Sequence, residues 1–73
     1  MTTAIIQRHT RTGTTVIEHL PLDRLADRME QLCKQRTAAV AKDRYGEEVG
    51  WVWKHEDTGR WCWMADDQQE HRA

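Results

Sequence analysis

The chain has 73 residues, 38% of them hydrophobic and 32% charged, which is enough for one small domain with a thin core. Its net charge of −1 is unevenly divided, because residues 1–45 carry +3 and residues 46–73 carry −4. This balance excludes the uniformly basic surface of a dedicated nucleic-acid binder, and no apolar run approaches the roughly 20 residues of a membrane helix. A chain of this length also has no room for a deep catalytic cleft beside its core.

The first 19 residues are mostly polar and contain two short β-favouring pairs, Ile5-Ile6 and Val16-Ile17. The threonine-rich stretch between the pairs contains one glycine and suits a hairpin. So few apolar residues are equally typical of a loose terminus. We expect a mobile basic arm at residues 1–14 and a strand at roughly residues 15–19, with a hairpin as the alternative.

The segment from Pro21 to Arg36 predicts an amphipathic helix. Proline is tolerated in the first turn, where its missing N–H has no partner to lose. Apolar residues then recur at spacings of three and four, at Leu22, Leu25, Met29 and Leu32. Lys34 and Arg36 suit the negative end of the helix dipole. We expect a strand to follow from Thr37.

Residues 37–65 predict a three-stranded antiparallel meander. Arg44-Tyr45-Gly46 suits a three-residue loop, which pairs Lys42 with Glu48 and Ala39 with Trp51. A two-residue turn at Tyr45-Gly46 would shift the register by one residue and exchange the two faces.

All four tryptophans lie in the second hairpin, as Trp51-x-Trp53 and Trp61-x-Trp63. Residues two apart in a strand share a face. A three-residue loop, Asp57-Thr58-Gly59, would place Trp53 opposite Trp63 and gather the indoles on one face. That face is either core beneath the helix or an open contact platform.

The opposite face is expected to be apolar too, with Ala38, Val40, Val52, Cys62 and Met64. One helix cannot cover both faces, so one face remains for the N-terminal segment or for a partner. The predicted fold class is α+β, with one helix on a three-stranded antiparallel meander and a mobile N-terminal arm or extra strand. Residues 15–65 form the single domain, and residues 66–73 are expected to be a disordered acidic tail.

No constellation of catalytic residues is recognisable in the sequence. The four histidines are scattered, and there is neither a nucleophile elbow nor a glycine-rich phosphate loop. Cys33, Cys62 and His55 could meet over a metal only from three separate elements without ligand spacing. We expect no enzymatic activity, no cofactor and no metal, and two buried, reduced thiols in a cytoplasmic protein.

The candidate partner-binding residues come from the arm and the tryptophan face: Ile5, Ile6, Arg8, Arg11, Trp51, Trp53 and Trp61. A basic arm can order on an acidic protein surface or on phosphates, and tryptophan is frequent in protein hot spots and in base stacking. These residues favour a protein-binding module. The alternative is a single-stranded nucleic-acid binder that uses the tryptophans as a platform.

From MTTAIIQRHTRTG through PLDRLADRMEQLCKQR to GWVWKHEDTGRWCWM, the chain resembles the small phage-encoded transcription regulators of the kind found in a Xanthomonas phage. The resemblance covers the full length and rests on size and overall pattern. It implies a non-enzymatic protein in the host bacterial cytoplasm that binds the large subunits of host RNA polymerase. Such a protein would inhibit transcription initiation and favour antitermination, and we expect it to be a monomer.

Overall fold

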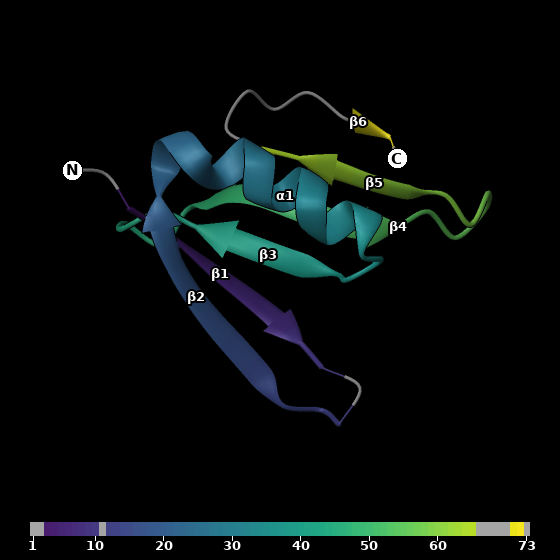
Figure 1. Ribbon diagram of the computed structural model, residues 1–73, viewed down its shortest axis with the longest axis horizontal. Coiled ribbons are helices and arrows are strands. Elements are labelled where there is room, and N and C mark those ends of the chain that lie inside the picture. The colour runs from purple at the N-terminus through teal and green to yellow at the C-terminus, as the bar shows by residue number, and fades with distance from the viewer. Residues whose placement is uncertain (1–2, 11, 66–70, 73) are drawn as a thin grey trace.

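The structure, a computed structural model, describes residues 3–10, 12–65 and 71–72. Figure 1 shows an antiparallel sheet with a helix across one face. The strands in the described residues are β1 (Thr3–His9), β2 (Thr15–Pro21), β3 (Ala39–Lys42), β4 (Glu48–Lys54), β5 (Trp61–Met64) and the two-residue β6 (His71–Arg72). Between β2 and β3 lie a 3-10 turn, η1 (Leu22–Arg24), and the helix α1 (Leu25–Lys34).

The order of the strands across the sheet is β2-β1-β3-β4-β5-β6. The expected α+β class is confirmed, but the expected three-stranded sheet is wrong, because the N-terminal hairpin adds β1 and β2 to it. Residues 3–9 therefore form a strand instead of the favoured mobile arm. The physical reason is burial, since the side chains of Ala4 and Ile6 are fully enclosed in the core.

The C-terminal expectation falls largely outside the described residues. Of the predicted acidic tail at 66–73, the structure describes His71 and Arg72, which pair with Trp63 and Cys62 of β5. No helix in the described part of the chain is long and apolar enough to cross a membrane.

Helix α1 lies over β4 and β5, while β1 and β2 extend beyond it (Figure 1). Its buried side chains are those of Leu25, Met29, Leu32 and Cys33, as the three- and four-residue spacing predicts. Small residues lie beneath the helix and let it approach the sheet closely. A Cβ atom on Gly50 would lie 3.3 Å from the Cβ of Ala41 and 3.3 Å from the Sδ of Met29.

An ion pair joins the helix to the outer strand β2. Arg28 donates hydrogen bonds from Nε to Oε1 of Glu18 at 2.9 Å and from Nη2 to Oε2 at 3.0 Å. Planar two-point contact of this kind fixes orientation as well as distance. The pair therefore joins α1 to β2 on the helix side of the sheet.

The hairpin between β3 and β4 has the predicted three-residue loop and the predicted pairing of Lys42 with Glu48. Asp43 and Glu47 close the loop, and Gly46 adopts a φ of 81°, which favours glycine. A bulge between Ala41 and Lys42 then shifts the register by one residue.

This bulge overturns the expected pairing of Ala39 with Trp51. Val40 lies opposite Trp51 instead, and Ala39 lies opposite Val52. Because cross-strand partners share a face, the alanine lies on the helix side of the sheet and Trp51 does not.

Candidate binding surface

The two tryptophan pairs lie on opposite faces of the sheet. His55 and Arg60 close the β4–β5 hairpin, since the His55 N–H donates to the Arg60 carbonyl at 2.9 Å. The loop between them has four residues, one more than predicted, so Trp53 lies opposite Cys62 and not opposite Trp63. A one-residue change in register moves every following side chain to the other face.

On the helix side, Trp61 and Trp63 pack against the core cluster beneath α1. Trp63 lies opposite Val52 on one side and His71 on the other. The rings of Trp63 and His71 are stacked, with centroids 4.1 Å apart and planes inclined by 15°. This pair of indoles therefore belongs to the core and its margin.

The other side of the sheet is not covered by α1, and we call it the helix-free face. A row of paired residues crosses it from β2 to β5: Ile17, Gln7, Val40, Trp51 and Met64. Ile5 and Trp53 lie two residues from members of this row on β1 and β4, and so share its face. The helix-free face is defined here by its apolar members, Ile5, Ile17, Val40, Trp51, Trp53 and Met64.

These side chains remain accessible to solvent. Ile17 is 56% exposed, and the other five are half-buried. A depression of about 330 Å³ lies among them, lined by Ala39, Val40, Trp51, Val52, Trp53 and Met64. None of its lining residues carries a charge. Apolar side chains left accessible on one face of a small domain make that face a candidate contact surface.

Polar groups flank the helix-free face. The indole Nε1 of Trp51 donates to Oε2 of Glu48 at 2.6 Å, and Lys42 lies opposite Glu48. His55 lies beside Trp53, with ring centroids 6.0 Å apart. The apolar part of this face on β3, β4 and β5 therefore has polar groups beside it, as protein interfaces do.

The structure distributes the predicted binding residues over several regions. Ile5, Trp51 and Trp53 lie on the helix-free face, with β3 between Ile5 and the two tryptophans, whereas Trp61 lies on the helix side. Ile6 is fully buried, so its side chain belongs to the core and not to any surface.

Of the two arginines of the predicted arm, the structure describes Arg8, which does not lie on the helix-free face. Arg8 is half-buried on the helix side, where it lies opposite Ala39, and its Nε has no hydrogen-bond partner within the described residues. Arg11 lies outside the described residues.

Val40 and Met64 were missed because the prediction placed them on the face opposite the tryptophans. The signal that could have found them is the length of the β4–β5 loop, since His55 to Arg60 also fits a four-residue turn with glycine last.

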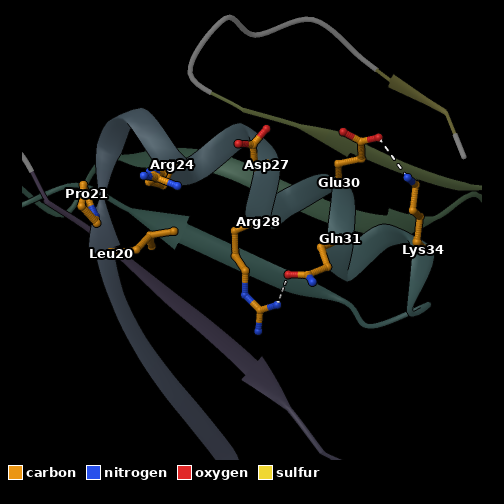
Figure 2. Close-up of a pocket in the computed structure, with 8 residues that line it drawn as sticks. All are labelled: Leu20, Pro21, Arg24, Asp27, Arg28, Glu30, Gln31 and Lys34. Carbon is orange, nitrogen blue, oxygen red and sulfur yellow. Dashed lines mark hydrogen bonds and ion pairs between the residues drawn. The ribbon is translucent and has the colours of Figure 1, made fainter.

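Another hollow follows the outer side of α1 and has a volume of about 830 Å³ (Figure 2). Three of its charged side chains, those of Arg28, Glu30 and Lys34, already have polar partners. Arg28 binds Gln31 and Glu18, and the Nζ of Lys34 lies 3.3 Å from Oε1 of Glu30. Figure 2 shows these side chains spread along the helix without converging on one point, as on a solvated helix flank.

No group of three or more metal-ligating side chains occurs among residues 3–10, 12–65 and 71–72. Both cysteines are buried, and the sheet separates them. Cys33 packs in the core beneath α1, whereas Cys62 shares the opposite side with Trp53.

Comparison with known proteins adds no relative. No family model matches the chain, and neither the curated proteins nor the solved structures contain a significant match. The function must therefore be argued from the residues and their geometry.

Proposed function

We propose that the protein is a non-enzymatic binding module that docks its helix-free face on a larger protein. The proposed partner is bacterial RNA polymerase, through its large subunits, with inhibition of initiation and support of antitermination as the outcome. The choice of polymerase as the partner rests on the resemblance of the sequence to phage-encoded transcription regulators. The docking mode comes from one observation: an apolar face with two half-buried tryptophans lies where α1 does not cover the sheet.

The residue types on this face favour a protein partner. Tryptophan is enriched among the residues that carry most of the free energy of protein association. Trp51 and Trp53 are positioned by the central strand β4, so little conformational entropy is lost when they are covered. The depression between them has no cation among its lining residues, which argues against a phosphate backbone as its occupant.

Regulation by such a protein requires no chemistry. A ligand that binds one state of an assembly more tightly than another shifts the equilibrium between them by the difference in binding free energy. A protein that prefers elongating polymerase over the initiating form would hinder promoter complexes and extend transcription past terminators.

The test is binding to purified bacterial core RNA polymerase, measured by biolayer interferometry with the protein immobilised. Val40→Lys places a charge in the middle of the helix-free face, and Trp53→Ser removes one of its indoles. Tyr45→Ser is the control, because Tyr45 is 74% exposed in the β3–β4 loop and lies outside that face.

We expect the wild-type protein and Tyr45→Ser to bind equally and the two face variants to bind at least about tenfold more weakly, since hot-spot substitutions cost about 2 kcal/mol or more. Circular dichroism verifies that each variant is folded. Absence of binding by the wild-type chain would contradict the polymerase as partner. Equal binding by all folded variants would contradict the docking face.

A further inference from the structure

A second hollow lies on the helix side of the sheet, where the C-terminus of α1 meets the β4–β5 loop. Its volume is about 520 Å³, within the range of roughly 300–1,000 Å³ that is usual for small-molecule sites. We call it the cationic pocket. It is lined by Cys33, Lys34, Arg36, Lys54, Thr58, Gly59, Arg60 and Trp61.

Four of these eight residues are basic and none is acidic, although the chain as a whole has a net charge of −1. Lys34 is paired with Glu30 of its own helix. Arg36, Lys54 and Arg60 have no ion pair with any residue in the described part of the chain. The pocket therefore concentrates unneutralised positive charge, which attracts an anion.

The backbone at Arg36 gives independent support. The N–H of Thr37 donates to the carbonyl of Leu32, and the N–H of Arg36 donates to that of Cys33, both at 3.0 Å. This is the Schellman ending of a helix, in which the residue at position 36 adopts a left-handed conformation and is usually glycine. Arg36 has a φ of 54° there. An arginine at this position costs backbone energy that glycine would not, and the side chain it contributes lies at the pocket.

Trp61 supplies a flat apolar wall. It lies opposite Lys54 across the β4–β5 ladder and packs against the core cluster, which holds its ring in place. An indole that is half-buried and held by the core can stack on a planar ring without losing side-chain freedom.

We propose that the cationic pocket binds a phosphate group joined to an aromatic base, with the phosphate held by Arg36, Lys54 and Arg60 and the base against Trp61. A free nucleotide and the end of a single strand both supply this chemistry. The site is distinct from the helix-free face, because Trp61 and Lys54 lie on the other side of the sheet from Trp51 and Trp53. The proposal therefore does not depend on the identity of the protein partner.

The ligands to compare are AMP, inorganic phosphate, a short single-stranded oligoadenylate and a glutamate pentapeptide. Each is titrated at low salt into ¹⁵N-labelled protein, and the amide of Gly59 and the indole N–H of Trp61 are followed. We expect AMP or the oligonucleotide to shift both signals, and the tighter of the two identifies the source. Inorganic phosphate should bind about tenfold more weakly than AMP, because it lacks the stacking ring.

Three variants test the residues. Arg60→Gln and Arg36→Gly should each weaken AMP binding about tenfold, as expected for loss of a charge-assisted hydrogen bond. Arg24→Gln removes the same charge from the opposite end of the helix segment and should leave binding unchanged. Arg36→Gly should at the same time raise the urea midpoint of unfolding, so weaker binding by this variant cannot be a result of misfolding.

The proposal is overturned if neither AMP nor the oligonucleotide binds. It is also overturned if the glutamate peptide or inorganic phosphate binds as tightly as AMP. It is also overturned if Arg24→Gln weakens binding as much as Arg60→Gln does, or if Arg36→Gly binds like the wild-type chain.

Discussion

The two faces of the sheet are built from the same strands and both carry apolar side chains, yet α1 covers only one of them. On β4, Gly50 and Val52 are buried beneath α1, while Trp51 and Trp53, which alternate with them, stay half-exposed on the other side. Small residues of β3 and β4 lie directly beneath α1, where the helix approaches the sheet closely. The largest side chains of β4 lie on the face that no helix covers. Two of the four indoles pack against the core and two lie on the face that α1 does not cover, so in so small a domain an indole is not by itself evidence of core.

The largest expected effect comes from the covered face. Leu32→Ala should lower the free energy of unfolding by about 3 kcal/mol, because it leaves a cavity between α1 and the sheet. Urea denaturation followed by circular dichroism measures the change. Tyr45→Ala is the matched exposed control and should change it by less than about 0.5 kcal/mol. Similar losses for both would mean that the helix does not seal this face.

Gly50→Val should lower the stability by about 2 kcal/mol, by forcing atoms into the closest contact between helix and sheet. The added Cβ would lie 3.3 Å from the backbone oxygen of Met64, which cannot move aside as a flexible side chain can. The measurement is the urea midpoint of unfolding of Gly50→Val. Val40→Thr, which keeps a β-branched residue on the helix-free face, serves as the comparison variant. A variant at Gly50 as stable as the wild-type chain would show that the helix does not pack this closely.

The two tryptophan pairs give the most direct comparison of stability between the faces. Trp63→Ala should cost about 1–1.5 kcal/mol more than Trp51→Ala, because Trp63 packs on the core cluster and stacks on His71. The free energies of unfolding of the two variants in urea provide the measurement. Equal costs would be expected if all four indoles shared one face, and would contradict the register observed here.

The smallest effect concerns the margin of the covered face. The coupling between Glu18 and Arg28 should be about 0.5–1 kcal/mol, since both side chains are partly exposed and the contact is two-pointed. A double-mutant cycle with Glu18→Gln and Arg28→Gln isolates it. The coupling should fall in 1 M salt. A coupling free energy of zero at low salt would show that the ion pair does not help to hold β2 to α1.

The helix and the turn between β3 and β4 could be predicted from the sequence because their signals are local. Leu25, Met29 and Leu32 define the buried stripe, and Gly46 marks the three-residue loop after β3. The place of β1 could not be predicted in this way. Its burial depends on pairing with β3, which lies about 30 residues further along the chain, and two isoleucines alone do not reveal that pairing.

The candidate site was predicted only in part, because it depends on register. Trp51 and Trp53 were identified, but the bulge at Ala41 and the extra residue in the β4–β5 loop each shift the pairing by one. The predicted register and the observed register both place apolar side chains on each face of the sheet, so the hydrophobic pattern does not distinguish the two registers. Val40 and Met64 therefore changed sides between prediction and structure.

Transferred cross-saturation from unlabelled bacterial core RNA polymerase to the deuterated, ¹⁵N-labelled protein tests the central claim, because it reports contact at each of the four indole N–H groups. If the helix-free face is the docking surface, the signals of Trp51 and Trp53 lose intensity and those of Trp61 and Trp63 keep it. Loss at Trp61 and Trp63 with Trp51 and Trp53 unchanged, or no loss at any indole, would contradict the claim.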